Sequence, residues 1–201
     1  MEGAIFRAGQ VAGYERCLGR RVFEKNSGRD GNFQKQLFLR LDKKFLRLEI
    51  FMVMKKLLVL VFTEGTTIMH SSTERIREYS SYVPVKNAVK KLTSWKGNGC
   101  EIFYLTSRTE QSEINQVKKV LVKYKFPRGP LYHRKEGEEY KDVVERVKPD
   151  ILVEDDCASI GADEIIAPKL NPKLNIKAIV VKEFSGIDHL PDEPVELMKY
   201  K

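Results

Sequence analysis

Residues able to bind phosphate and metal ions occur directly after three of the strands that the sequence predicts. They are Thr63, Glu64, Gly65 and Thr66 after the first strand, Thr106 and Ser107 after the second, and Asp155 and Asp156 after the fourth. In an open α/β sheet, ligands bind outside the carboxyl ends of the strands. We therefore expect these residues to lie together at one edge of a sheet and to form the site.

The residue types at this edge are those of a phosphoryl-transfer site. Asp155 and Asp156 suit a hard cation such as Mg²⁺, which prefers oxygen ligands and keeps waters that a phosphate can replace. Two adjacent carboxylates at the end of a buried strand repel each other, which favours a cation beside them. Hydroxyl groups, backbone N–H groups of a turn with glycine, and a lysine would hold the phosphate oxygens. The third predicted helix begins near Lys135 and Lys141, so we expect a lysine at the same edge.

Strands and helices alternate along the chain from residue 57 onward. We predict strands at 57–62, 101–105, 131–133, 151–153 and 176–181, and helices at 84–95, 110–124 and 138–147. Pro84 is expected in the first turn of the first helix, where proline is well tolerated. The run 57–62 is continuously apolar, as in a strand buried on both faces, although a buried helical segment could give the same run. Strands separated by helices indicate βαβ units, so the predicted class is α/β, a three-layer sandwich with a mainly parallel, Rossmann-like sheet.

Composition indicates a globular protein in a reducing compartment. The 201 residues can hold one domain with a sizeable core, and hydrophobic and charged residues make up 42% and 32% of them. Three cysteines without paired spacing favour free thiols, and no apolar run is long enough to span a membrane. We expect a cytoplasmic protein that does not bind membranes, and composition leaves its oligomeric state open.

The positive charge is concentrated at the N-terminal end of the chain. Residues 1–53 carry 11 lysines and arginines against 6 acidic residues, a net charge of +5 out of the total of +8. The segment has no sustained apolar period and contains several glycine turns. We predict that 1–53 is a basic, poorly ordered extension and that 54–201 is the α/β domain. Two alternatives are a basic arm that contacts an acidic partner and a protein whose domain begins at Met52 or Met54. Because the excess charge lies mainly in this extension, we do not expect a nucleic-acid surface.

The order of the polar groups resembles the haloacid dehalogenase (HAD) superfamily over about residues 57–181. That family has an Asp-x-Asp-Gly-Thr turn after the first strand, a Thr or Ser after the second, a Lys, and an acidic pair after the fourth. The matching residues are Glu64-Gly65-Thr66, Thr106 and Asp155-Asp156. Lys141 is preferred to Lys135 for the third motif because it lies one helix before the acidic pair. The short segment before Pro84 is similar to that of a member with a minimal cap.

The resemblance implies a role for each matching residue. It implies catalysis by Glu64, Thr106 and Lys141, phosphate binding by Thr63, Gly65, Thr66 and Ser107, and Mg²⁺ binding by Asp155 and Asp156. Glu64 would be the general acid–base, one methylene longer than the family's aspartate. The ligand would be a phosphorylated small molecule or a phosphoprotein.

The chain departs from the family at the nucleophile. Aligning Glu64 with the second aspartate of the motif places Phe62 where the family has the aspartate that attacks phosphorus. Phenylalanine can neither form an acyl-phosphate nor bind a metal ion, so the covalent route fails. Shifting the alignment by one residue puts Thr63 at that position, breaks the Gly-Thr match and leaves the threonine without an evident base.

Two functions are open for this sequence. The first is a HAD-like protein with a phosphatase-type Mg²⁺ site, which would be a Mg²⁺-dependent phosphohydrolase if it is active. The second is a non-catalytic module that uses the same fold to bind a phosphorylated ligand or a protein. A response-regulator receiver has its acid pair after the first strand instead of the fourth, and a dinucleotide-binding oxidoreductase needs a Gly-x-Gly-x-x-Gly turn after Phe62.

The same residues have purely structural interpretations. Thr106 and Ser107 could cap the second helix, and Asp155 and Asp156 could cap the segment that follows them. Cys157 lies beside the acid pair, but no histidine is placed to activate it, which favours a structural role.

Overall fold

The computed structural model describes residues 56–162 and 164–200. All of them belong to one compact unit, Lys55–Lys201. The predicted basic extension, residues 1–53, lies outside the described residues, so its interpretation stays a prediction.

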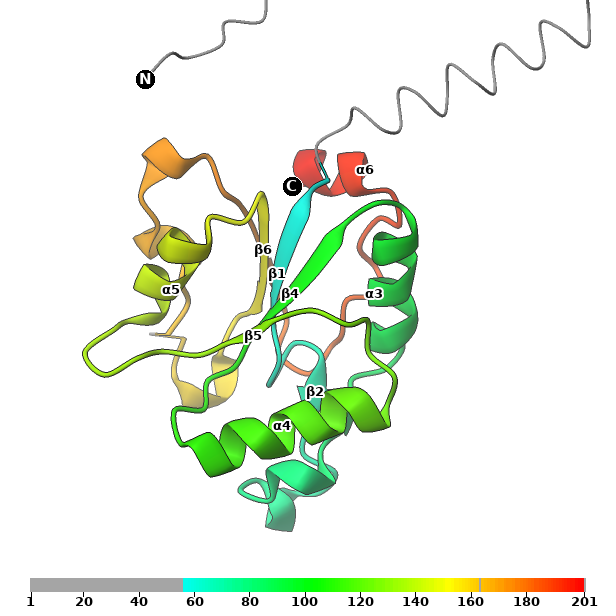
Figure 1. Cartoon of the computed structure of the whole chain (residues 1–201), viewed down its shortest axis with the longest axis vertical. Helices are drawn as coiled ribbons and strands as arrows, with labels where there is room; N and C mark the ends of the chain where they lie inside the picture. Colours follow the sequence, from blue (N-terminus) through cyan, green and yellow to red (C-terminus); the bar gives the residue numbers. More distant parts are fainter. Residues whose placement is uncertain (1–55, 163, 201) are drawn as a thin grey trace, which may run out of the picture. The chain divides into compact units, whose positions relative to one another are not determined.

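The described residues form a five-stranded sheet (Figure 1). Its strands are β1 (Leu58–Phe62), β4 (Glu101–Leu105), β5 (Leu131–Tyr132), β6 (Ile151–Asp155) and β7 (Lys177–Val181). They lie in the order β5-β4-β1-β6-β7, and each neighbouring pair is parallel. The chain therefore moves outward from the central strand in one direction through β4 and β5, and in the other through β6 and β7. A reversal of this kind creates a crevice at the carboxyl ends of the strands.

Helices cover both faces of the sheet. They are α3 (Ala88–Gly97), α4 (Gln111–Lys123), α5 (Tyr140–Val147) and α6 (Pro194–Lys199). Figure 1 shows α3 and α5 on opposite sides of the sheet. Val59 and Val61 of β1 share a core cluster with residues of α3 and α4, whereas Leu60 packs with Val143 and Val144 of α5. Successive side chains of a strand point to opposite faces, so the continuous apolar run supplies both cores. The predicted three-layer α/β class with a parallel, Rossmann-like sheet is confirmed.

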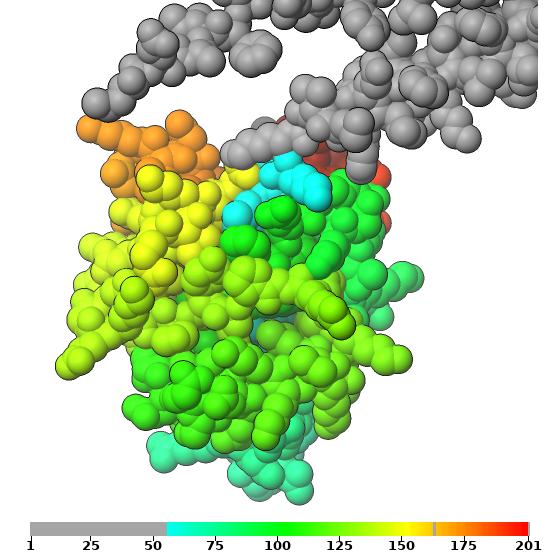
Figure 2. Space-filling model, viewed as in Figure 1, coloured from blue at the N-terminus to red at the C-terminus, as the bar shows by residue number. Residues whose placement is uncertain are grey.

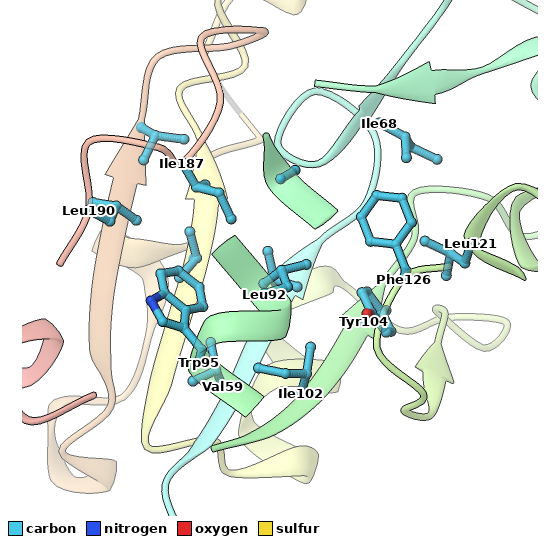
Figure 3. Close-up of a cluster of buried hydrophobic side chains, with 14 of the residues drawn as sticks. Val59, Ile68, Leu92, Trp95, Ile102, Tyr104, Leu121, Phe126, Ile187 and Leu190 are labelled. Carbon is cyan, nitrogen blue, oxygen red and sulfur yellow. The ribbon is translucent and has the colours of Figure 1, made fainter. Parts of the chain in front are cut away.

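The larger of the two cores lies between the sheet and helices α3 and α4 (Figure 3). Leu92 and Trp95 of α3 are fully buried and share this core with Val59 and Ile102 of the sheet. The indole N–H of Trp95 donates to the carbonyl oxygen of Pro191 at 2.8 Å, which satisfies its one polar group. The packing fixes the relative positions of the strands whose ends carry the site.

The prediction that a helix begins at Pro84 is wrong. Pro84 pairs with Ile68 in an antiparallel hairpin formed by β2 (Ile68–Met69) and β3 (Val83–Pro84), and α3 begins only at Ala88. The missing N–H of proline is tolerated at a strand edge as well as in a first helical turn, so the residue type alone does not decide. Val85 N donates to Thr67 O at 2.9 Å, which ties the hairpin to the turn after β1.

Short 3₁₀ helices complete the connections between these elements. They are η1 (Thr73–Arg75), η2 (Tyr79–Ser81), η3 (Ala158–Ile160), η4 (Ala167–Lys169) and η5 (Pro172–Leu174). Figure 2 shows that the segments from β4 to α5, in green and yellow-green, cover most of the viewed face. Within residues 56–162 and 164–200, no helix has the length and apolar character needed to cross a membrane.

Candidate functional site

A cavity of about 460 Å³ lies at the carboxyl edge of the sheet. Residues from the ends of all five strands line it. They include Phe62, Glu64 and Gly65 at β1, Ser107 and Arg108 after β4, Arg134 after β5, Asp155 and Cys157 at β6, and Glu183 and Phe184 after β7. Its volume is typical of small-molecule sites, which span about 300–1,000 Å³. The cavity lies at the edge where the sequence analysis places the polar groups.

The Glu64 carboxylate joins the end of β1 to the end of β4. Its Oε1 accepts a hydrogen bond from Thr106 Oγ1 at 2.6 Å. Its Oε2 accepts one from Thr63 Oγ1 at 2.6 Å and one from Ser107 N at 3.1 Å. The Glu64 side chain is only 14% exposed, and Nε of Arg108 lies 3.9 Å from Oε1. A carboxylate so far removed from water needs donors of this kind, because burial without partners is costly.

The turn after β1 packs directly against the end of β6. Thr66 Oγ1 donates to Asp155 Oδ2 at 2.9 Å, and Cys157 N donates to Asp155 Oδ1 at 3.0 Å. Gly65 has a φ of +82°, and a Cβ atom there would lie 2.5 Å from Asp155 Oδ2. Only glycine fits, since both the backbone conformation and the available space exclude a side chain. Phe184 N donates to the carbonyl oxygen of Gly65 at 2.9 Å, so the segment after β7 holds the same turn.

Three carboxylates gather after β6 and β7. Oxygen atoms of Asp155, Asp156 and Glu183 all lie within 4.8 Å of one another. Mg²⁺ binds oxygens at about 2.1 Å, so ligands on opposite sides of one ion lie about 4.2 Å apart. The cluster therefore fits such an ion after small side-chain movements. Burial raises the pKa of the Asp155 carboxyl, and the negative charge of Glu183 raises it further. A bound cation would offset this repulsion.

Hydrogen bonds hold the rest of the acidic cluster in place. Asp156 Oδ1 accepts from Glu183 N at 2.9 Å, and the Glu183 carboxylate accepts from both N and Oγ of Ser159 at 2.7 Å. The sequence analysis named Asp155 and Asp156 but missed Glu183. The signal was present, because Glu183 follows closely after the predicted strand 176–181, as the acid pair follows the predicted strand 151–153.

Phe62 ends β1 and lines the cavity. Its ring lies edge-on to the ring of Tyr140, with the ring centres 5.5 Å apart and the planes at 73°. Edge-to-face pairs of this kind add about 0.5–1.5 kcal/mol beyond the area they bury. The Tyr140 hydroxyl in turn donates to the carbonyl oxygen of Ser107 at 3.2 Å. A packed aromatic ring thus occupies the carboxyl end of the central strand.

Two arginines supply positive charge to the cavity. Arg108 follows β4 and Arg134 follows β5, and both line it. Lys141 does not line the cavity, and its Nζ lies 3.4 Å from a carboxylate oxygen of Glu139. The structure therefore brings Glu64, Thr106 and Ser107 together but leaves Lys141 apart from them. The sequence analysis missed both arginines, although Arg108 directly follows Thr106 and Ser107.

The Cys157 thiol is not an activated nucleophile. Burial raises its pKa to about 12, and the negative charges of Asp155 and Glu154 act in the same direction. The residue itself adopts a left-handed backbone conformation, with a φ of +47°. Because the thiolate is the reactive form, a thiol with this pKa is inert at neutral pH.

Comparisons with known proteins give likeness of fold alone. No family profile matches the sequence, and no curated protein matches it. The chain is similar to part of the Pnkp1/Rnl/Hen1 complex, with 13% identity and a TM-score of 0.49 over 65% of this chain and 48% of that one. It thus spans about half of that matched protein.

Two further solved structures match at lower scores. One is D,D-heptose 1.7-bisphosphate phosphatase from B. bronchiseptica complexed with magnesium and phosphate, with 10% identity, a TM-score of 0.42, and coverage of 64% and 94% of the two chains. The other is a lipopolysaccharide core biosynthesis protein from Thermoplasma volcanium GSS1, with 16% identity, a TM-score of 0.34, and coverage of 64% and 97%. None of these scores reaches the level at which a function could be transferred.

Glu154 is a buried acid on the opposite side of β6 from Asp155. Its side chain accepts hydrogen bonds from the backbone N–H groups of Ile166 at 2.9 Å and Ala167 at 2.7 Å, and the residue is 2% exposed. Burial raises the pKa of Glu154 from 4.5 to about 7, although the two backbone donors oppose the shift. Glu154 therefore links the loop before β7 to the sheet and binds a proton more tightly in the folded protein than in the unfolded chain.

We predict that Glu154 makes the protein less stable as the pH rises from about 4.5 through 7. Protonated Glu154 stabilises the folded state, and this contribution is fully present at a pH below the pKa of the unfolded chain. The contribution is lost as the pH rises through the higher pKa of the folded protein. At 1.36 kcal/mol per pKa unit, the loss between pH 5 and pH 8 is about 2–3 kcal/mol. Glu154→Gln cannot titrate, so its free energy of unfolding in urea should decline by that much less over this range.

The matched control is Glu136→Gln, at an exposed position. It should keep the pH dependence of the parent protein. A Glu154→Gln variant with the parent's full decline would show that Glu154 does not titrate in this range.

Proposed function

We propose that this chain is a HAD-like domain that binds Mg²⁺ and a phosphorylated ligand at the carboxyl edge of its sheet, without hydrolysing that ligand by the family's covalent route. The observation that carries the proposal is the position of Phe62. It lines the cavity at the end of the central strand, where the HAD-like motif would have the attacking aspartate. A cavity of about 460 Å³ favours a small phosphorylated molecule over a phosphoprotein.

Neither Thr63 nor Cys157 is suited to replace the missing nucleophile. The Thr63 hydroxyl is fully buried and donates to Glu64 Oε2 at 2.6 Å, so the shifted alignment also lacks a free attacking group. The Cys157 thiol is protonated at neutral pH because its pKa is about 12. Both features support a site that binds without the covalent step.

The acidic cluster supports the choice of a hard divalent cation. Asp155, Asp156 and Glu183 offer carboxylate oxygens within 4.8 Å of one another, and oxygen is the ligand that Mg²⁺ prefers. When bound, Mg²⁺ would neutralise part of the charge of a phosphate and would leave coordination positions for its oxygens. Asp155 and Glu183 also line the cavity, so the ion and the ligand would share one site.

Glu64 and Thr106 serve in this proposal as positioning residues. Both oxygens of Glu64 already accept hydrogen bonds, from Thr106, Thr63 and Ser107. The carboxylate holds Ser107 and the start of the following segment at the cavity wall. Ser107 and Gly65 line the cavity and remain proposed phosphate-binding positions, whereas Thr66 is fully buried and its hydroxyl donates to Asp155. Lys141 does not line the cavity and has no part in a site that binds its ligand without hydrolysing it.

We predict that Mg²⁺ stabilises the protein and that Asp155→Asn removes the effect. At ten times its dissociation constant, a ligand of the folded state adds about 1.4 kcal/mol, or about 3–6 °C in melting temperature for a domain of this size. Asn keeps an oxygen for Cys157 N, and the Thr66 hydroxyl can accept instead of donate. Without metal, the same variant should melt higher than the parent because it relieves repulsion with Glu183.

Scanning calorimetry with and without Mg²⁺ measures both effects. Glu136→Gln removes an acid outside the cluster and should respond to Mg²⁺ as the parent does. No shift in the parent at millimolar Mg²⁺ would mean that Asp155 and Asp156 only cap the segment after β6.

We predict that the parent protein hydrolyses p-nitrophenyl phosphate no faster than a blank, and that Phe62→Asp gains Mg²⁺ affinity with slow turnover. The new carboxylate would lie at the end of β1, the strand that pairs with β6, and would supply the missing nucleophile. It should also lower the free energy of unfolding by about 2–4 kcal/mol, because the ring packed on Tyr140 is replaced by a charge.

Phe62→Asn is the matched control, with the same shape but no nucleophile. It should lose similar stability and show no turnover. Rapid Mg²⁺-dependent hydrolysis by the parent would refute the proposal, and a Phe62→Asp variant with unchanged Mg²⁺ affinity would refute the assignment of position 62.

A further inference from the structure

Charge is divided across the carboxyl edge of the sheet. The basic residues that line the cavity, Arg108 and Arg134, follow β4 and β5 on one side of the central strand. The acidic cluster follows β6 and β7 on the other side. Phe62 stands between them at the end of β1. The order of the strands therefore separates the two arginines from the acidic cluster. Three further acids, Glu64, Glu154 and Glu164, also line the cavity.

We infer that Arg108 and Arg134 bind the anionic group of the ligand, in place of Lys141, and that the ligand is a phosphate monoester with a planar, apolar body. The inference rests on the proposed function, since it names the ligand class and the phosphate-binding residues of the same site. Arginine suits this role because its planar guanidinium donates two parallel hydrogen bonds to phosphate oxygens.

Arg108 is held in position with donors to spare. Its Nε donates to Ser107 Oγ at 3.1 Å, its Nη2 donates to the same oxygen, and its Nη1 donates to the Tyr79 hydroxyl. A guanidinium carries five N–H groups, so two are left for a ligand. Its charge centre also lies 4.8 Å from the centre of the Tyr79 ring. The side chain is thus fixed before any ligand arrives, which lowers the entropic cost of binding.

Arg134 carries an unused buried donor. Its guanidinium lies over the Tyr140 ring, 4.1 Å from the ring centre. Its Nε is buried and has no hydrogen-bond partner within the described part of the chain. A buried N–H without a partner is destabilising, and an anion in the cavity would supply the missing acceptor. The ring of Tyr140 fixes the plane of the guanidinium, so its donors share one orientation.

Apolar and aromatic side chains also line the cavity. Phe62 packs edge-on to Tyr140 beside Arg134, and the Phe184 ring packs edge-on to His70 with centres 5.4 Å apart. Two isoleucines at the cavity are unusually open to solvent, Ile76 at 51% and Ile160 at 63% exposed. A planar body attached to the phosphate would cover these surfaces, and burial of about 100 Å² of apolar area improves affinity about tenfold or more.

The test is a calorimetric titration of the full chain, in Mg²⁺, with phenyl phosphate, glycerol 3-phosphate and inorganic phosphate. Phenyl phosphate should bind about tenfold more tightly than either of the others. Arg134→Gln should weaken all three by about tenfold or more, since a charged hydrogen bond is lost. Arg134→Lys should recover only part of the loss, because it keeps the charge without the planar fork. Lys119→Gln, at an exposed position outside the cavity, is the matched control and should bind within about twofold of the parent. Lys141→Gln tests the rival assignment and should also bind as the parent does, because Lys141 does not line the cavity.

Each contrary result has a separate meaning. Equal affinity for phenyl phosphate and inorganic phosphate would overturn the inference that the ligand has a planar, apolar body. Parent-like binding by Arg134→Gln, with weakened binding by Lys141→Gln, would overturn the arginine assignment while leaving the proposed function intact. Failure of all three phosphates to bind the parent would refute the proposed function and this inference together. A normal melting temperature for Arg134→Gln shows that any loss of affinity is not a loss of fold.

Discussion

The Glu64 carboxylate is the contact on which the site depends. It is nearly removed from water, and three donors from two strands converge on it, Thr63, Thr106 and Ser107. Desolvation would make a lone carboxylate at this position costly, so the donors and the acceptor fix one another. The consequence extends beyond the pair of strands. Burial lowers the pKa of the Arg108 guanidinium, but the negative charge of Glu64 and the contacts with Tyr79 together outweigh this, so the pKa ends above its usual value. Glu64 therefore helps to hold the charge of Arg108 at the cavity.

The turn that carries Glu64 is fastened on its other side as well. Gly65 has no side chain, so its Cα approaches the Asp155 carboxylate closely, and Thr66 donates to that carboxylate. One short turn thus connects the ends of β4, β1 and β6. Its position at the reversal of strand order explains why residues far apart in the sequence meet there. The sheet topology places the arginines and the acidic cluster on opposite sides of β1, and the turn after β1 lies between them.

The sequence predicted the strands better than it predicted the details between them. β1 and β6 begin as short, continuous apolar runs, and such runs predict buried strands. The polar residues at the ends of these runs lie at the carboxyl edge of the sheet, as predicted. Pro84 was misplaced because its conformation suits both a helix start and a strand edge, and only pairing with Ile68 decides. Arg134 and Glu183 were missed for different reasons. Arg134 follows a strand of two residues with little signal, whereas Glu183 follows a clear strand whose end was not considered.

The same cavity brings together an acidic cluster and a packed pair of aromatic rings. Burial raises the pKa of Asp155 and the charge of Glu183 raises it further, so a cation beside these carboxylates, which lie within 4.8 Å of one another, would offset that cost. The Phe62 ring packs against Tyr140, and the Tyr140 ring also holds the guanidinium of Arg134 in one orientation. The aromatic residue at the end of β1 is therefore part of the wall that holds Arg134 in position. Replacing Phe62 with aspartate would remove the ring that packs on Tyr140 and would add a nucleophile. The affinity for the phosphorylated ligand should therefore fall while turnover rises.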